Sequence, residues 1–280
     1  MISMNKVKIK YYHHSGFSCS VNDEILLVFD YWLGQYQELD SNIRITEEYL
    51  SQYQQVYVFV SHSHPDHYDE IIYTWRHPKI HYIISSDIQN PLIGRKINPD
   101  QFIRLDDEIT VNTYESTDLG VAYSVTIKGI HIFHAGDLNM WHWREESSPT
   151  EIQEAENEFK RICNKIKEPI DIAFFPVDPR QGQLFEAGAN YFQMNIKPKV
   201  MIPMHFWNKK EMIIDYAKKN RNRITEIIPM VNSGETIMIC IYQDGYMLIE
   251  KDNQDEKQNI RNKMNDPFNN TDQPVNLDRL

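Results

Sequence analysis

A short run in the first quarter of the chain, Ser-His-Ser-His-Pro-Asp-His at residues 61–67, carries His62, His64, Asp66 and His67. Packing does not explain this density, because histidine is intermediate in burial and aspartate is seldom buried without a partner. Neutral imidazole nitrogens and carboxylate oxygens are ligands that zinc, manganese and iron accept. The run therefore predicts a metal-binding site.

The sequence places this run at the end of a strand. Residues 56–60 (Val-Tyr-Val-Phe-Val) form an apolar, β-branched and aromatic segment, which is typical of a buried strand. Further polar clusters follow apolar strands in the same way, at residues 116–118 (Ser-Thr-Asp), 134–137 (His-Ala-Gly-Asp), 178–180 (Asp-Pro-Arg) and 203–205 (Pro-Met-His). Catalytic groups usually lie on loops that a rigid scaffold positions. We expect these loops to meet at one edge of a sheet system.

The remaining pattern predicts a strand-rich first half, followed by alternating helices and strands. Ile152, Phe159 and Ile166 recur at helical spacing and predict an amphipathic helix. Two mixed sheets that face each other, with helices outside, fit this order. We expect strands at residues 7–12, 24–30, 56–60, 79–85, 101–104, 110–114, 121–128, 131–135, 171–177, 199–203, 236–242 and 246–250, and helices at 46–54, 149–168, 185–195 and 209–220.

Length and composition indicate an ordinary globular protein. The 280 residues are 41% hydrophobic and 25% charged, enough for a sizeable core. The net charge of −11 argues against nucleic-acid binding, which needs clustered lysine and arginine, but it leaves room for a small anionic substrate. No apolar stretch reaches membrane-spanning length. The polar segment 251–280 lacks apolar periodicity, so we expect a domain over 1–250 and a flexible C-terminal tail over 251–280.

The cysteines and the N-terminal segment favour the cytoplasm. Cys19, Cys163 and Cys240 are few, odd in number and far apart, so a disulfide framework is not expected and buried inert thiols are. Residues 1–17 lack the apolar region of a signal peptide. We therefore expect a reducing, cytoplasmic location. The sequence does not indicate whether the chain forms a homo-oligomer.

Taken together, these motifs resemble those of the metallo-β-lactamase superfamily, and within it the L-ascorbate-6-phosphate lactonase-like hydrolases. The resemblance runs from about Val7 to Glu250. It is carried by HxHxDH at residues 62–67, HSGF at 14–17, LLVFD at 26–30, HAGD at 134–137 and PMH at 203–205.

The resemblance implies an α/β fold, an αββα sandwich with a binuclear metal site at one edge of the sheets. His62 and His64 would bind the first metal ion, Asp66 and His67 the second. Asp137 would bridge the two ions, and His205 would complete the second site. Two divalent ions, zinc foremost and manganese or iron as alternatives, would generate hydroxide at neutral pH and polarise the scissile group. Asp66 would also accept a proton from the attacking water.

One position departs from the pattern of the superfamily, which usually has a further histidine ligand before the Gly-Asp motif. No histidine lies between His81 and His131. We expect Asp118 to take this place, and an oxygen ligand there would make manganese or iron more competitive with zinc. The alternative is a weak first site and one tightly bound metal ion.

Several further residues have a functional and a structural interpretation. His14 would contact the substrate or lie in a turn. Trp141, His142 and Trp143 would line the substrate pocket or pack a loop. Arg180 would bind a phosphate or carboxylate of the substrate, or form a surface ion pair.

Two other histidines flank the Gly-Asp motif on the same strand. His131 lies within the expected strand and is interpreted as a core or supporting residue. His134 comes directly before the motif and is a candidate partner for a metal ligand.

The leading functional prediction is a metal-dependent hydrolase of a small-molecule ester, lactone or phosphodiester. The main alternative is a catalytically silent metal-binding or sensing protein of the same fold, which the departure at Asp118 favours. A nuclease is disfavoured by the acidic charge balance. An oxygen-reducing diiron protein of this fold would usually carry glutamate where His64 stands, and a secreted β-lactamase would need an export signal.

Overall fold

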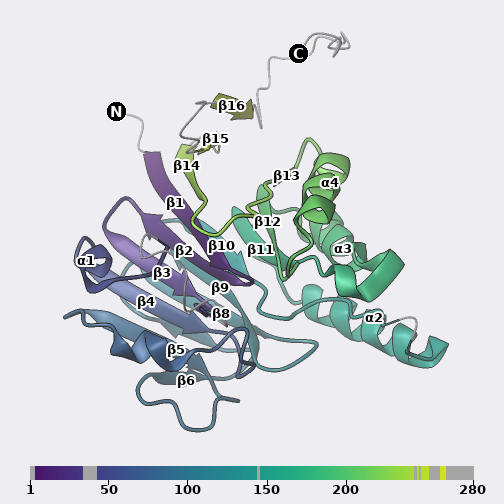
Figure 1. The fold of residues 1–280 in the computed structure, drawn as a ribbon, viewed down its shortest axis with the longest axis horizontal. Helices are drawn as coiled ribbons and strands as arrows, with labels where there is room; N and C mark the ends of the chain where they lie inside the picture. Colours follow the sequence, from purple (N-terminus) through teal and green to yellow (C-terminus); the bar gives the residue numbers. More distant parts are fainter. Residues whose placement is uncertain are drawn as a thin grey trace.

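The computed structural model describes residues 4–33, 43–143, 146–242, 245, 247–251 and 259–262. They form two mixed β-sheets that lie face to face, with helices on the outer faces (Figure 1). The expected αββα sandwich is therefore confirmed. Within the described residues no helix is both long and apolar enough to cross a membrane.

The first sheet has nine strands in the order β16-β15-β14-β1-β2-β3-β4-β5-β6. Antiparallel pairs run from β16 to β3, and parallel pairs run from β3 to β6. The strands are β1 (Met4–His13), β2 (Gly16–Val21), β3 (Ile25–Phe29), β4 (Gln55–Val60), β5 (Ile80–Ser85), β6 (Arg95–Ile97), β14 (Thr236–Tyr242), β15 (Met247–Lys251) and β16 (Asn259–Asn262).

The second sheet has seven strands in the order β13-β12-β11-β10-β9-β8-β7. It is parallel from β13 to β10 and antiparallel from β10 to β7. The strands are β7 (Phe102–Arg104), β8 (Ile109–Glu115), β9 (Val121–Ile127), β10 (Ile130–His134), β11 (Ile172–Pro176), β12 (Val200–Met204) and β13 (Glu226–Ile227).

Three long helices, α2 (Pro149–Cys163), α3 (Ala187–Ile196) and α4 (Lys210–Asn220), cover the second sheet, as Figure 1 shows. Helix α2 begins with a capping box between Ser148 and Glu151. The short helix α1 (Glu47–Leu50) and the 3-10 helix η1 (Glu70–Thr74) contribute Leu50 and Ile72 to a smaller apolar cluster against the first sheet. A second 3-10 helix, η2 (Pro179–Leu184), follows β11.

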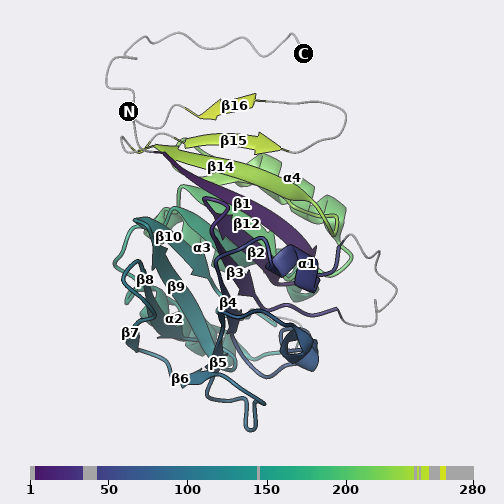
Figure 2. The same cartoon turned by 90° about the vertical axis from the view of Figure 1, so that its left-hand side faces the viewer.

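The two sheets enclose the main apolar core. Phe17 and Phe29 of the first sheet belong to the same buried cluster as Phe174 of the second. Ring centroids of Phe17 and Phe174 lie 4.4 Å apart. Figure 2 shows the strands of the two layers running past each other, with β14, β15 and β16 at one end. This packing fixes the strand ends that carry the polar loops.

The expected strands and helices are present, but the helix expected over 46–54 is reduced to four residues in α1 and the helix expected over 149–168 ends at Cys163. Strand β2 was not expected. Its sequence, Gly-Phe-Ser-Cys-Ser-Val, carries serines that mask the apolar pattern, although all six residues are buried. Short strands β6 and β13 were also not expected. Of the tail expected over 251–280, the structure describes the end of β15 and all of β16, which pairs with β15. The other tail residues, and residue 246 of the strand expected over 246–250, lie outside the described part.

Candidate metal centre

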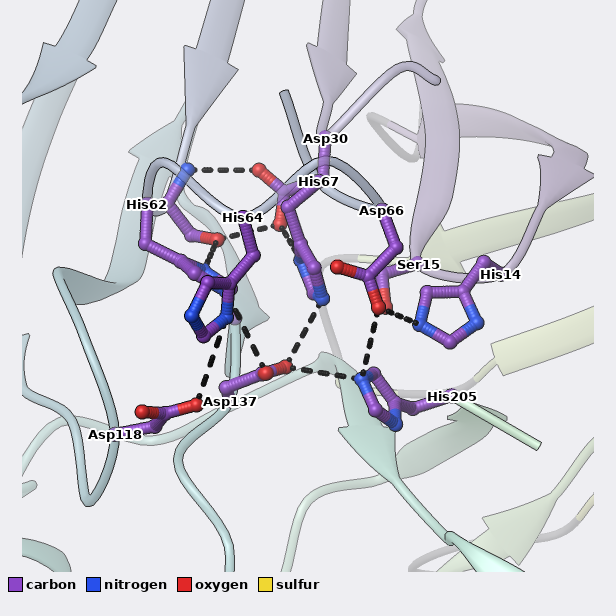
Figure 3. A network of polar contacts seen from close by, with 12 residues as sticks. His14, Ser15, Asp30, His62, His64, Asp66, His67, Asp118, Asp137 and His205 are labelled. Carbon is purple, nitrogen blue, oxygen red and sulfur yellow. Dashed lines mark hydrogen bonds and ion pairs between the residues drawn. The ribbon is translucent and has the colours of Figure 1, made fainter. Parts of the chain in front are cut away.

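The run at residues 61–67 follows β4 directly and lies at the edge shared by the two sheets (Figure 3). His62 Nε2 lies 3.0 Å from His64 Nδ1 and 3.5 Å from Asp137 Oδ2. These donor atoms converge on one point, and His62 and Asp137 are buried while His64 is partly exposed. They form the first ligand group.

The second ligand group consists of His14, Asp66, His67 and His205. His14 Nε2 lies 3.2 Å from Asp66 Oδ2, and His205 Nε2 lies 3.9 Å from the same oxygen. His14 comes from the turn between β1 and β2, and His205 follows β12. The backbone amide of His205 lies 3.4 Å from the His14 carbonyl, and this contact joins the two sheets at the site.

Asp137 lies between the two groups and offers a different oxygen to each. Its Oδ2 faces His62, whereas its Oδ1 lies 3.1 Å from His67 Nε2 and 3.5 Å from His205 Nε2. The loop that carries it reaches this position through Gly136, which has a φ of 56°. A Cβ at Gly136 would lie 2.8 Å from the Ser61 Cβ, so only glycine allows this close approach. Asp137 thus lies between the two groups, and its bridging role, which the resemblance implied, stays a prediction.

Two buried carboxylates outside the groups orient the histidines. Asp30 Oδ2 accepts a hydrogen bond from His67 Nδ1 at 2.8 Å, and Asp178 Oδ2 accepts one from His205 Nδ1 at 2.9 Å. In each case the Nε2 atom is left facing the group. Asp30 also accepts hydrogen bonds from the Ser61 amide and hydroxyl, at 2.7 and 2.6 Å. The sequence marked both aspartates only as strand-end residues, because their partners lie far away in the chain.

The arrangement fits divalent metal ions. His14 Nε2, His67 Nε2, His205 Nε2 and Asp137 Oδ1 are buried, and in the described structure they make only the ion-pair contacts within the two groups given above, without a well-formed hydrogen bond. Burying polar atoms without well-formed hydrogen bonds is costly, and native proteins rarely do so without a ligand. Two ligands that bind one zinc ion tetrahedrally at about 2.05 Å lie roughly 3.3 Å apart. Many of the separations given above, from 3.0 to 3.5 Å, match this value.

Burial and neighbouring charges also set the protonation of the groups. Burial lowers the pKa of His14 to about 3 and that of His62 to about 4, so both rings are neutral at pH 7 and able to bind metal. Burial opposes the charged form of His67, but the carboxylates of Asp137 and Asp30 outweigh it and raise the pKa of His67. The same charge pairing lowers the pKa of Asp137 against the effect of its burial. Metal binding at His67 must therefore displace a proton.

Asp118 lies beside the first ligand group but is not one of its three members, His62, His64 and Asp137. Its Oδ2 atom is 3.6 Å from His64 Nδ1. Figure 3 marks this contact with a dashed line. Burial and the nearby Asp137 raise the pKa of Asp118. Its loop is held against the Gly-Asp loop by Thr117, whose hydroxyl donates to the carbonyl of Asn139 at 2.6 Å. The geometry is consistent with Asp118 as a further oxygen donor to the first group.

A cavity of about 400 Å³ opens onto both groups and is walled by Trp141, Trp143 and Arg180. The two indoles are stacked with centroids 5.6 Å apart. His142 was expected in this wall but points away, because its Nε2 lies 3.0 Å from Glu156 Oε1 of helix α2. Alternate residues of an extended segment face opposite sides, which separates His142 from the two tryptophans.

Arg180 forms an ion pair and also lies in the cavity wall, where its expected contact with a substrate anion stays a prediction. Its guanidinium pairs with Asp178, with Nε 3.0 Å from Oδ1, and it also lines the cavity. His134 is buried, stacks on Phe29 and contacts the Ser15 carbonyl through Nε2 at 2.9 Å, so it supports the site from behind. His131 Nδ1 lies 3.1 Å from the Thr126 hydroxyl on the neighbouring strand, which makes it a structural residue.

Comparison with known proteins identifies the fold. No protein-family model matches the chain, and no curated protein matches it. Among solved structures, a proposed metal-dependent hydrolase from Parabacteroides distasonis superimposes with a TM-score of 0.58 at 14% identity, over 80% of this chain and 93% of that one. The metallo-β-lactamase fold protein YhfI from Bacillus subtilis superimposes with a TM-score of 0.52 at 13% identity, over 84% of this chain and 99% of that one. The chain therefore has the metallo-β-lactamase fold.

Proposed function

We propose that this protein is a metal-dependent hydrolase of a small-molecule ester, lactone or phosphodiester. The observation that carries this proposal is the pair of buried ligand groups that share Asp137 and face an open cavity. A purely structural role does not require several buried histidine nitrogens to face carboxylates and one another beside an open cavity. The likeness to a proposed metal-dependent hydrolase supports the same conclusion through the shared fold.

We assign the ligands of two divalent ions as follows. His62, His64 and Asp137, with Asp118 as an oxygen donor, hold one ion. His14, Asp66, His67 and His205, together with the second oxygen of Asp137, hold the other. The mixture of imidazole and carboxylate donors suits zinc first, and manganese or iron as alternatives. Such ions lower the pKa of a coordinated water and polarise an acyl or phosphoryl oxygen.

The protein's own residues position the substrate and move protons. Asp66 is partly exposed and lines the cavity, so its carboxylate is placed to accept a proton from water. The stacked indoles of Trp141 and Trp143 provide a flat wall that excludes water from one side of the cavity. Arg180 brings a positive charge to the cavity edge and is suited to an anionic substrate.

The finer assignments follow from the sequence motifs. HSGF at residues 14–17 and HAGD at 134–137 resemble the L-ascorbate-6-phosphate lactonase-like hydrolases, and we propose that the protein belongs to this branch. We further propose that it acts in the cytoplasm on a small molecule and not on nucleic acid, in keeping with its net charge of −11.

A substrate panel tests the proposal. Metal-free protein is reconstituted with Zn²⁺ or Mn²⁺ and assayed against lactones, phosphodiesters and thioesters. Turnover that is lost in His62→Ala and in Asp137→Asn, and that chelator abolishes, is the expected result. His131→Ala is the matched control, since this histidine bonds within a sheet and not in the centre. Tight metal binding without turnover of any substrate would instead support the silent metal-binding alternative.

A further inference from the structure

A larger cavity, of about 680 Å³, adjoins the metal centre. It shares Asp66 and Arg180 with the smaller cavity that opens onto the ligand groups. Its wall contains the aromatic side chains of Trp32, Phe206 and Trp207. The two cavities thus meet at Asp66, beside the position where the scissile bond must lie.

Trp207 lines the larger cavity and has a strained backbone. Its φ is 52°, and His205, two residues earlier, has a φ of 64°. A bulky residue in this region is a genuine outlier that costs stability and persists only where the surrounding structure enforces it. The indole contacts the ring of His14, with centroids 4.5 Å apart, and the guanidinium of Arg180, which lies 4.7 Å from the indole centroid. These contacts hold the indole at a defined place in the wall.

Trp32 approaches His14 from the other sheet. It follows β3, whereas Trp207 follows β12, and its ring lies 5.0 Å from His13 and 6.0 Å from His14. Both indoles therefore contact His14 and line one cavity. Such a wall recognises a flat apolar or aromatic group by stacking and by burial of its faces.

The cavity also carries positive charge. Lys209 and Arg180 both line it. Arg180 is paired with Asp178, whereas Lys209 has no ion-pair partner in the described part of the chain. The neighbouring Lys210 does not line the cavity, and its Nζ lies 2.9 Å from Asn232 Oδ1. In a protein with a net charge of −11, this placement of cations beside an aromatic wall favours an anionic ligand.

We propose that this larger cavity is a substrate subsite for a planar aromatic ring that carries an anionic group. Trp32 and Trp207 contact the ring, and Lys209 pairs with the anionic group. The inference rests on the proposed function, since the ring is one side of the hydrolysed bond. The substrate class that follows is an ester, lactone or phosphodiester with an anionic aryl portion.

Calorimetric titration of the metal-free full-length protein with naphthalene-1-sulfonate tests the subsite without requiring catalysis. We expect binding that is weakened about fivefold to tenfold in Trp207→Leu and largely restored in Trp207→Phe, which keeps a ring. Lys209→Gln weakens binding of the sulfonate but not of neutral 1-naphthalenemethanol, because only the sulfonate carries a charge. Cyclohexanesulfonate binds the wild-type protein more weakly than naphthalene-1-sulfonate, because it lacks the aromatic ring. Matched controls are Lys79→Gln, which removes an exposed lysine outside the cavity, and Phe102→Leu, which removes an exposed ring outside it; neither changes the dissociation constant.

The outcomes separate the subsite from the proposed function. The subsite proposal is refuted if both Trp207→Leu and Lys209→Gln bind naphthalene-1-sulfonate as the wild-type protein does, with folding verified by circular dichroism. This holds even if the metal-loaded protein hydrolyses esters. Binding that depends on Trp207 and Lys209 supports the subsite, and absence of turnover by the same metal-loaded protein would then count against the proposed function alone.

Discussion

Substitution of Asp178 tests how the outer carboxylates support the metal centre. Its Oδ2 atom lies 2.9 Å from His205 Nδ1, and this contact leaves His205 Nε2 facing the second ligand group. In Asp178→Asn an amide of the same shape still accepts a hydrogen bond but lacks the negative charge that makes the ring a better ligand. In Asp178→Ala the acceptor is gone, and the ring can adopt the other tautomer or turn away.

The expected magnitude follows from the number of such contacts. Removing an outer-shell partner of a metal-binding histidine typically costs tenfold to a hundredfold in metal affinity, or about 1.4–2.7 kcal/mol. Since Asp178 supports one histidine of the second group, we expect about a tenfold loss of affinity in Asp178→Asn and about a hundredfold loss in Asp178→Ala. The loss falls on one of the two ions and leaves the first group unchanged.

Competition with a chromophoric chelator measures the Zn²⁺ affinity of the metal-free proteins. Arg180→Gln is the matched control, because it removes the other partner of Asp178 and leaves the contact with His205 in place. We expect it to change the affinity by less than about threefold. Wild-type affinity in Asp178→Ala, or an equal loss at both ions, would refute the assignment of Asp178 as the residue that orients His205.

Three further predictions concern the ligands themselves. His14→Ala lowers the metal affinity of the second ligand group about tenfold, whereas His13→Ala leaves this affinity unchanged. If chelator competition gave equal affinities for the two variants, His14 would not be a ligand. Asp118→Ala lowers the occupancy of the first ion as His62→Ala does, and metal analysis showing loss only in His62→Ala would exclude Asp118. Because the carboxylates around His67 raise its pKa, its ring is protonated at pH 7 without metal. Metal binding should therefore release about one proton and weaken as pH falls. Calorimetry in buffers of different ionisation enthalpy measures this release, and none at pH 7 would contradict it.

Most of the fold was predictable because its strands are apolar and its loops are polar. Residues 55–60 and 172–176 are buried strands with few polar side chains, and they stand out in the sequence. Strand β2 does not, because its buried Ser18 and Ser20 interrupt the hydrophobic pattern. The polar character of these serines hid a strand that lies in the middle of the first sheet.

The candidate site was predictable where a motif is local in sequence and less so where it depends on register. The spacing of His62, His64 and His67 is itself a metal-binding pattern. The position of His14 in the second group depends on the pairing of β1 with β2 and on the approach of the loop after β12, which no local pattern encodes. The orientation of His142 toward Glu156 likewise depends on the packing of helix α2.

The central claim is that the two buried ligand groups hold divalent metal ions. The most direct measurement is an anomalous-scattering map from crystals of the protein reconstituted with Zn²⁺ or Mn²⁺. We expect one peak among His62, His64 and Asp137, and a second among His14, Asp66, His67 and His205. A map with no peak at either group, from protein shown by solution analysis to have been exposed to excess metal, would contradict the account.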